Sequence, residues 1–123
     1  MICECFYIMK IEALSDSWFC FEFKNHEIVP TNYTIGTQIG GPNCNHLKNR
    51  TFEGSKDKVS WTKLDDEKNC PRLNRSCFCH AFPIQNENHM SFKYLRIHQA
   101  GQTWYDSYNL LIGCVEFYGQ LVI

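Results

Sequence analysis

The chain has no long apolar run and almost no net charge. Nowhere do about 18 apolar residues follow one another, so no membrane-spanning helix is predicted. The formal net charge is −1 over 123 residues. The positive field that gathers phosphate backbones is therefore missing, and we expect no nucleic-acid partner. Glu4 stands where a secretory signal would place basic residues, and Lys10 and Glu12 interrupt the apolar stretch that follows. We therefore predict a cytoplasmic location.

Motifs for catalysis and cofactor binding are also missing. The glycines of the 36–41 stretch are followed neither by a helix start nor by a P-loop lysine. The five histidines and eight cysteines stand in no nucleophile elbow and in no local signature of a cysteine protease. The acidic run at 65–67 lacks the alternation and the glycine of a calcium loop, so we interpret it as a solvated charge run within a loop. We predict that the protein is not an enzyme and has no cofactor.

The stretch Cys77-Phe78-Cys79-His80 contains ligand types that zinc prefers, but its spacing does not fit. Structural zinc sites place two to four residues between paired cysteines, and on a strand Cys79 and His80 point to opposite faces. Cys77 and Cys79 could share a face, with Cys44 and His46 as remote partners. Buried or surface thiols are the simpler interpretation, so we predict no metal.

The redox state of the cysteines depends on the compartment. An even number of cysteines in a short chain is compatible with four disulfides. Without an export signal, the reducing cytosol favours free and mostly buried thiols. The positions of Cys20 and Cys114 inside predicted strands agree with buried thiols. The sequons at Asn32, Asn49 and Asn74 would matter only for an exported chain.

Short alternating segments rich in aromatic residues dominate the rest of the sequence. Aromatic residues make up 15% of the chain, and nine of them are Phe, so large rings are expected to build the core. In the segment 92–99, Leu95 and Ile97 share one face with Lys93 and Gln99, a period of two. Strands are predicted at 18–24, 28–37, 51–54, 59–64, 78–84, 92–99 and 108–119. Pro30 indicates a bulge or an edge position in the second of these. Polar turns between the segments favour an all-β fold, an antiparallel sandwich of two sheets.

Several motifs also resemble a known domain. The stretches that carry the resemblance are Trp18 to Lys24, Asn32-Tyr33-Thr34-Ile35, Phe52-Glu53-Gly54-Ser55 with Trp61 beyond it, Ser76 to Asn86, Arg96-Ile97-His98-Gln99-x-Gly101-x-x-Trp104, Tyr108-x-Leu110-Leu111 and Glu116-Phe117-Tyr118-Gly119. In this order they resemble the discoidin domain, also called coagulation factor 5/8 type C, over residues 17–123. The likeness is greatest to the intracellular variety that is linked to BTB proteins or stands alone in protists. It implies a jelly-roll sandwich of the galactose-binding-like kind.

The N-terminal segment 1–16 matches nothing in that family and stays unassigned. A complete discoidin domain places further strands and two loops ahead of the position of Trp18. The resemblance therefore implies that the first strands are missing or replaced. A missing strand would leave an open sheet edge that could associate with another chain.

The loops are the places where a sandwich would bind a ligand. Trp104, Tyr105 and Asp106 combine rings with a hydrogen-bonding group in one loop. The family uses the Trp of this loop as a plug, so a packing role for Trp104 stands beside ligand contact. A second candidate surface consists of Asn43, Asn45, His46 and Lys48 in the loop 38–50. Arg96, on the same strand face as Tyr94 and His98, faces solvent or braces a neighbouring loop.

The resemblance implies a non-catalytic recognition module that binds a protein partner through these loops. The alternative is a carbohydrate-binding, lectin-like module, which the galactose-binding-like fold and the aromatic, Asn-rich loops suggest by analogy. A truncated domain without an autonomous function is the third hypothesis.

Overall fold

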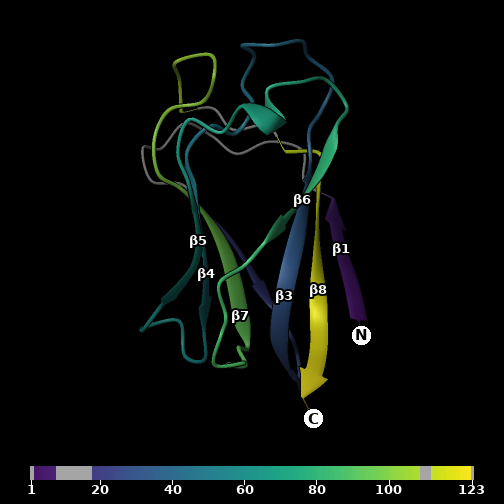
Figure 1. Ribbon diagram of the computed structural model, residues 1–123, viewed down its shortest axis with the longest axis vertical. Helices are drawn as coiled ribbons and strands as arrows, with labels where there is room; N and C mark the ends of the chain where they lie inside the picture. Colours follow the sequence, from purple (N-terminus) through teal and green to yellow (C-terminus); the bar gives the residue numbers. More distant parts are fainter. Residues whose placement is uncertain (1, 8–17, 109–111, 123) are drawn as a thin grey trace.

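The protein is a sandwich of two antiparallel β-sheets, which a computed structural model describes for residues 2–7, 18–108 and 112–122. Figure 1 shows the sheets as two layers, with β4, β5 and β7 in one and β1, β3 and β8 in the other. The strands are β1 (Ile2–Tyr7), β2 (Trp18–Glu22), β3 (Glu27–Gly36), β4 (Arg50–Ser55), β5 (Thr62–Glu67), β6 (Cys79–Pro83), β7 (Tyr94–Gln99) and β8 (Cys114–Val122). One sheet has the order β1-β8-β3-β6 and the other the order β2-β7-β4-β5. The predicted all-β sandwich is confirmed.

Helical structure is confined, within the described ranges, to one 3₁₀ turn, η1 (Pro71–Leu73). No helix among these residues has the length and apolar character needed to cross a membrane.

Alternation along β7 places its side chains as the sequence predicts. Leu95, Ile97 and Gln99 are buried between the sheets, whereas Tyr94 and His98 on the other face are only partly covered. Phe92 departs from the prediction, because it is buried and precedes the strand. Its backbone pairs with Ile28 of the other sheet through two hydrogen bonds of 2.8 and 2.9 Å.

The bulge predicted at Pro30 is confirmed in β3. The register of β3 against β8 shifts between Pro30 and Asn32. Proline has no N–H to donate to a ladder, so a bulge accommodates it within a strand that is paired on both sides. Gly119 faces this region, and its backbone lies close to the carbonyl of Val29. β8 begins later than predicted, at Cys114, and residues 109–111 of the predicted strand lie outside the described residues.

Aromatic rings fill the space between the sheets. Tyr33 of β3 stacks on Phe52 of β4, with 4.2 Å between the ring centroids. Phe52 in turn stacks on Phe117 of β8 at 5.8 Å, and Tyr33 stacks on Phe82 of β6 at 5.4 Å. The two pairs that include Phe52 join the sheets and contribute beyond the burial of apolar area, whereas Tyr33 and Phe82 stack within one sheet.

The acidic run at 65–67 lies in β5, so its assignment to a loop is wrong. The hairpin of β4 and β5 is confirmed, but β5 runs from Thr62 to Glu67, beyond the predicted end at Leu64. β5 is an edge strand of its sheet, and charged residues are a common feature of edge strands because they discourage further pairing. Because β5 starts at Thr62 and not at residue 59, the turn of the hairpin is longer than predicted.

The N-terminal segment supplies an edge strand. β1 pairs with β8 over the register from Ile2 opposite Gly119 to Tyr7 opposite Cys114. The side of β8 that a missing first strand would leave open is therefore paired. The sheet edges are β1 and β6 in one layer and β2 and β5 in the other.

Free thiols are present at five described positions, Cys20, Cys44, Cys70, Cys77 and Cys79. Cys70 is buried and Cys20 lies in β2, whereas Cys77 and Cys79 are exposed.

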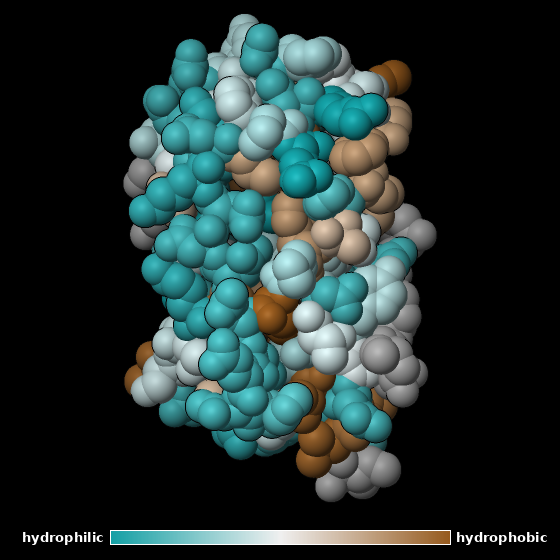
Figure 2. Space-filling view, in the orientation of Figure 1, coloured by the Kyte–Doolittle hydropathy of each residue, from teal (hydrophilic) through white to brown (hydrophobic). Residues whose placement is uncertain are grey.

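The face of the molecule in Figure 2 is mostly hydrophilic, and hydrophobic residues show there as small separate groups.

Candidate functional site

The loop between β3 and β4 meets the loop between β7 and β8 at one end of the sandwich, the upper end in Figure 1. Between them lies an open hollow of about 570 Å³, which we call the Tyr105 hollow. Its lining residues are Asn43, Lys48, Trp104, Tyr105 and Asp106. The sequence places these candidates in two loops more than 50 residues apart. The fold brings all five around one space.

A tight turn positions the 103–107 loop. The Thr103 N–H donates to the Ser107 carbonyl at 2.7 Å, and the Asp106 N–H donates to the Thr103 carbonyl at 3.0 Å. Asp106 has a φ of +56°, a left-handed conformation that Asp and Asn tolerate better than most residues. The turn therefore presents Tyr105 and Asp106 at its tip.

Asn45 joins the two loops through hydrogen bonds and does not line the hollow. Its Oδ1 accepts hydrogen bonds from the hydroxyls of Thr103 at 3.0 Å and Ser107 at 2.6 Å. Thr103 is completely buried. Asn45, predicted as a surface contact, thus holds the turn in place.

Trp104 is fixed along its edge and on one face. Its Nε1–H donates to the Cys70 carbonyl at 3.1 Å, and its backbone N–H donates to the His46 carbonyl at 3.2 Å. The Lys48 ammonium lies 4.7 Å from the centroid of the indole ring. These contacts give Trp104 a packing role, and it still lines the hollow.

The groups that remain available in the hollow are an exposed ring and three polar side chains. Tyr105 is 66% exposed. Asn43 Oδ1 accepts a hydrogen bond from Asn74 at 3.2 Å, which orients the Asn43 amide. The Asp106 carboxylate adds an acceptor, and Lys48 adds a donor. A polyhydroxylated ring could stack on Tyr105 and exchange hydrogen bonds with these groups.

His46 and Arg96 do not line the hollow. His46 is completely buried, and its Nε2 lies 2.7 Å from the Gly40 carbonyl and 3.2 Å from the Gly41 carbonyl. It holds the 40–46 loop together. Arg96 lies on the outer face of the sheet β2-β7-β4-β5, where its Nε donates to Glu53 Oε1 at 2.5 Å.

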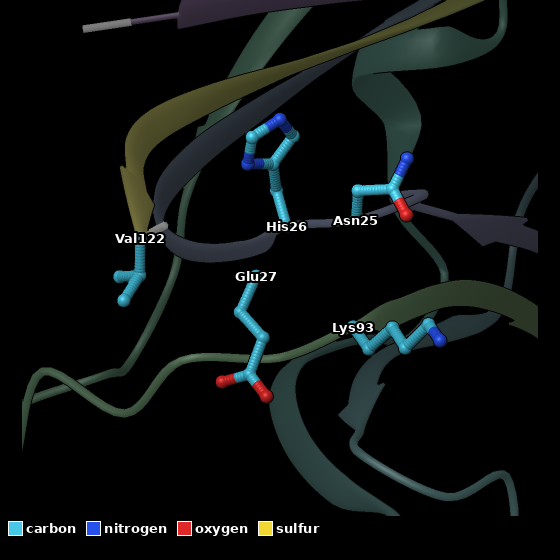
Figure 3. Close-up of a pocket in the computed structure, with 5 residues that line it drawn as sticks. All are labelled: Asn25, His26, Glu27, Lys93 and Val122. Carbon is cyan, nitrogen blue, oxygen red and sulfur yellow. The ribbon is translucent and has the colours of Figure 1, made fainter.

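A second hollow, of about 400 Å³, lies at the opposite end of the sandwich and was not predicted from the sequence. Figure 3 shows that its residues come from the β2–β3 turn, the start of β3, the segment before β7 and the end of β8. They are Asn25, His26, Glu27, Lys93 and Val122. A hydrogen bond from Ser91 holds the pKa of Glu27 below its usual value. No Phe, Tyr or Trp side chain of the described residues lines this hollow, so it lacks the large exposed ring of the Tyr105 hollow.

No group of three or more His, Cys, Asp or Glu side chains converges within ranges 2–7, 18–108 and 112–122. Cys44 and His46 lie in the β3–β4 loop, whereas Cys79 lies in β6.

Solved structures of low sequence identity share this fold. CpGH89CBM32-6 from Clostridium perfringens is 16% identical over 90% of this chain and 75% of its own, with a TM-score of 0.62. The family 32 carbohydrate-binding module of Streptococcus pneumoniae EndoD is 6% identical over 89% of this chain and 73% of its own, with a TM-score of 0.63. CpGH89CBM32-5 from C. perfringens, solved in complex with GalNAc-β-1,3-galactose, is 9% identical over 88% and 69%, with a TM-score of 0.54.

No protein-family model and no curated protein matches the sequence. The chain has the galactose-binding-like sandwich fold of these modules.

Proposed function

We propose that the protein is a non-catalytic carbohydrate-binding module and that it binds a sugar in the Tyr105 hollow. The observation that carries the proposal is the convergence of two loops, at one end of a galactose-binding-like sandwich, around an exposed ring, an amide, a carboxylate and an ammonium. The structural neighbours favour this alternative over the protein-partner hypothesis, since several of them are carbohydrate-binding modules. The fold by itself does not determine the ligand.

The hollow offers the two kinds of contact that sugar binding requires. The C–H face of a pyranose would stack on Tyr105, whose ring is mostly solvent-exposed before binding. Asp106 would accept hydrogen bonds from hydroxyl groups, while the Asn43 amide and the Lys48 ammonium would donate to sugar oxygens. The volume of about 570 Å³ lies within the range of small-molecule sites. It leaves room for one or two sugar rings.

Glycan-array screening followed by calorimetry tests the proposal. GalNAc-β-1,3-galactose is the first probe, because a structural neighbour was solved with it. We expect one class of glycan to bind the wild-type chain and Tyr105→Ala to weaken this binding about tenfold, the loss of one stacked ring.

Ile39→Ala is the matched control. Ile39 is 82% exposed and lies in the β3–β4 loop at the same end, but it does not line the hollow. It should leave affinity unchanged. A folded chain with a flat array, or equal binding by wild type and Tyr105→Ala, would contradict the proposal. A flat array together with reproducible capture of one cytosolic protein would support the protein-partner alternative.

A further inference from the structure

The outer face of the sheet β2-β7-β4-β5 carries an aromatic and cationic cluster that the Tyr105 hollow does not include. We call it the Trp18 platform and define it as Trp18, Trp61, Arg96, Glu53 and Lys58. The antiparallel register aligns Cys20, Arg96 and Glu53 in a row across β2, β7 and β4, and it places Trp18 beside His98. The opposite face of β7 is buried against the other sheet, so this row points outward.

Arg96 is fixed between two indole rings. Its guanidinium carbon lies 3.9 Å from the centroid of Trp61 and 5.6 Å from that of Trp18. Its Nε is bound to Glu53 at 2.5 Å, and both side chains are largely covered, at 17% and 14% exposure. Trp18 is 48% exposed. The arginine therefore orders the two rings and leaves Trp18 open to solvent, a rigid surface that would lose little entropy on binding.

One cation on this face has no ion-pair partner in the part of the chain that the structure describes. Lys58 lies 5.0 Å from the ring centroid of Tyr94, which stands on the same face. Glu53 is paired with Arg96 and Glu22 with Lys93, whereas no acidic side chain among the described residues forms an ion pair with Lys58. One cationic charge at the Tyr94 end of β7 thus lacks an ion-pair partner within the described ranges. The exposed indole of Trp18 stands at the other end of the strand, opposite His98, and Arg96 lies between the two ends. A ligand that combines a ring with a carboxylate suits this arrangement.

We propose that the Trp18 platform binds an extended acidic glycan, a chain of uronic acid residues, as a second site separate from the Tyr105 hollow. A sugar ring stacks on the exposed part of Trp18, and carboxylates further along the glycan lie next to the outer edge of the Arg96 guanidinium and next to Lys58 at the Tyr94 end of β7. A chain rather than a single sugar fits an open sheet face, because each ring makes few contacts and affinity grows with the number of rings engaged. This inference goes beyond the proposed function and does not depend on it.

The test compares three polymers by calorimetry with the full chain. Polygalacturonate is the probe, fully methyl-esterified polygalacturonate has the same backbone without the charge, and polyglutamate has charge without sugar rings. We expect polygalacturonate to bind at least tenfold more tightly than either of the others. Equal binding of polyglutamate would show charge attraction alone and would overturn the proposal, as would equal binding of the methyl ester or no binding at all.

Two variants locate the site. Trp18→Ala should weaken polygalacturonate binding about tenfold. Lys58→Asn should weaken it about threefold, since Asn removes the charge and tolerates the left-handed φ of +65° at this exposed turn position. Unchanged affinity in both would overturn the proposal and leave the cluster a purely structural brace. If Trp18→Ala does not fold, the polygalacturonate affinity of Lys58→Asn alone decides whether the proposal stands.

Tyr105→Ala is the control that separates the two sites. It should leave polygalacturonate binding unchanged, because Tyr105 lies in the loops at the end of the sandwich and not on the sheet face. A loss of polygalacturonate binding in Tyr105→Ala would assign the acidic chain to the Tyr105 hollow and overturn the second site. If Tyr105→Ala loses binding of the glycan that the array identifies but retains polygalacturonate binding, both sites are supported independently.

Discussion

The indole Nε1–H of Trp104 donates a hydrogen bond of 3.1 Å to the backbone carbonyl of Cys70. This bond ties the β7–β8 loop to the segment before η1, so it places one wall of the Tyr105 hollow. Trp104→Phe keeps an aromatic ring and removes the donor. We expect it to lower the free energy of unfolding by about 1 kcal/mol, the net value of one such bond. Urea denaturation measures the change.

Tyr105→Phe is the control for Trp104→Phe. It also removes one polar group from a ring of the same loop, but Tyr105 is mostly exposed. Its unfolding free energy should stay within about 0.5 kcal/mol of the wild type. A loss in Tyr105→Phe as large as that in Trp104→Phe would show that the Cys70 bond does not stabilise the loop.

A buried relay connects the sheets through Tyr33. Arg50, fully buried, donates from Nε to the Tyr33 hydroxyl at 3.0 Å, and this hydroxyl donates to Asp65 Oδ2 at 2.6 Å. The Nη1 and Nη2 atoms of Arg50 are buried without a hydrogen-bond partner among the described residues, so Nε carries the polar contact of the guanidinium. Tyr33→Phe would leave Nε unpaired as well. We expect a loss of about 2 to 3 kcal/mol in urea denaturation, the cost of losing a hydrogen bond to a buried charged group.

The stacking of Tyr33 on Phe52 and Phe82 would survive in Tyr33→Phe, so ring packing does not enter the difference. Asp65 is partly exposed and can bind water in place of the hydroxyl. A change below about 0.5 kcal/mol would mean that Arg50 is already satisfied by solvent.

Gly119 allows β8 to approach the bulge of β3. A Cβ at this position would lie 2.3 Å from the Val29 carbonyl oxygen and 2.9 Å from the Pro30 Cα, and neither backbone atom can move aside without disturbing the ladder. Gly119→Ala should therefore cost about 2 to 3 kcal/mol of stability. Thermal or urea unfolding of the variant measures this loss.

Gly41→Ala is the matched control on the same chain. No atom lies within 4 Å of the position that its Cβ would take. Its effect should range from no change to a gain of about 1 kcal/mol, because alanine restricts the unfolded chain. Similar losses in the two variants would contradict the packing argument for Gly119.

Glu67 gives the stability of the protein a defined pH dependence. Burial, together with the nearby Asp65 carboxylate, raises the pKa of Glu67 above its ordinary value of 4.5, and Arg50 opposes part of the rise. The folded chain thus binds the Glu67 proton more tightly than the unfolded chain does. The contribution of Glu67 to the free energy of unfolding is fully present below pH 4.5 and is lost as the pH rises through the raised pKa.

Glu67→Gln removes that contribution. The difference in unfolding free energy between Glu67→Gln and wild type should grow in favour of the variant as the pH rises from 4.5 toward neutrality. Urea denaturation at several pH values measures it, and subtracting the two curves cancels groups such as Glu27 that titrate in both. A difference that is flat with pH would contradict the raised pKa.

The predictable part of the fold is the part governed by local alternation. The period of two around Leu95 and Ile97 fixes which face of β7 is buried, and Pro30 marks a bulge because the missing N–H is a local property. The strand at Ile2–Tyr7 has no such signal. It is defined by its pairing with β8, more than 100 residues away, which no local pattern reveals. The position of β5 also differs from the prediction, since the strand starts at Thr62 and ends at Glu67 where 59–64 was predicted.

The candidate site residues were predicted from residue type alone. Whether each of them is exposed or buried depends on the residues that surround it in the fold. Polar residues in a polar loop were taken as surface contacts, yet His46 is buried because the Gly40 and Gly41 carbonyls need a donor. Trp18 and Trp61 appeared only as parts of a resemblance. Their common contact with Arg96 arises from the pairing of β2 with β7 and from the path of the β4–β5 turn beside them, and single-sequence reasoning supplies neither.

The antiparallel pairing of β1 with β8 sets Ile2 opposite Gly119, near the last described residue, Val122. Both ends of the chain thus lie at the lower end in Figure 1, away from Tyr105 and Asp106. A support, fluorophore or fused protein attached at either end would hold the molecule at the end opposite the Tyr105 hollow, with the loops of the hollow directed outward. Immobilised binding assays can therefore use either attachment point without blocking the proposed ligand.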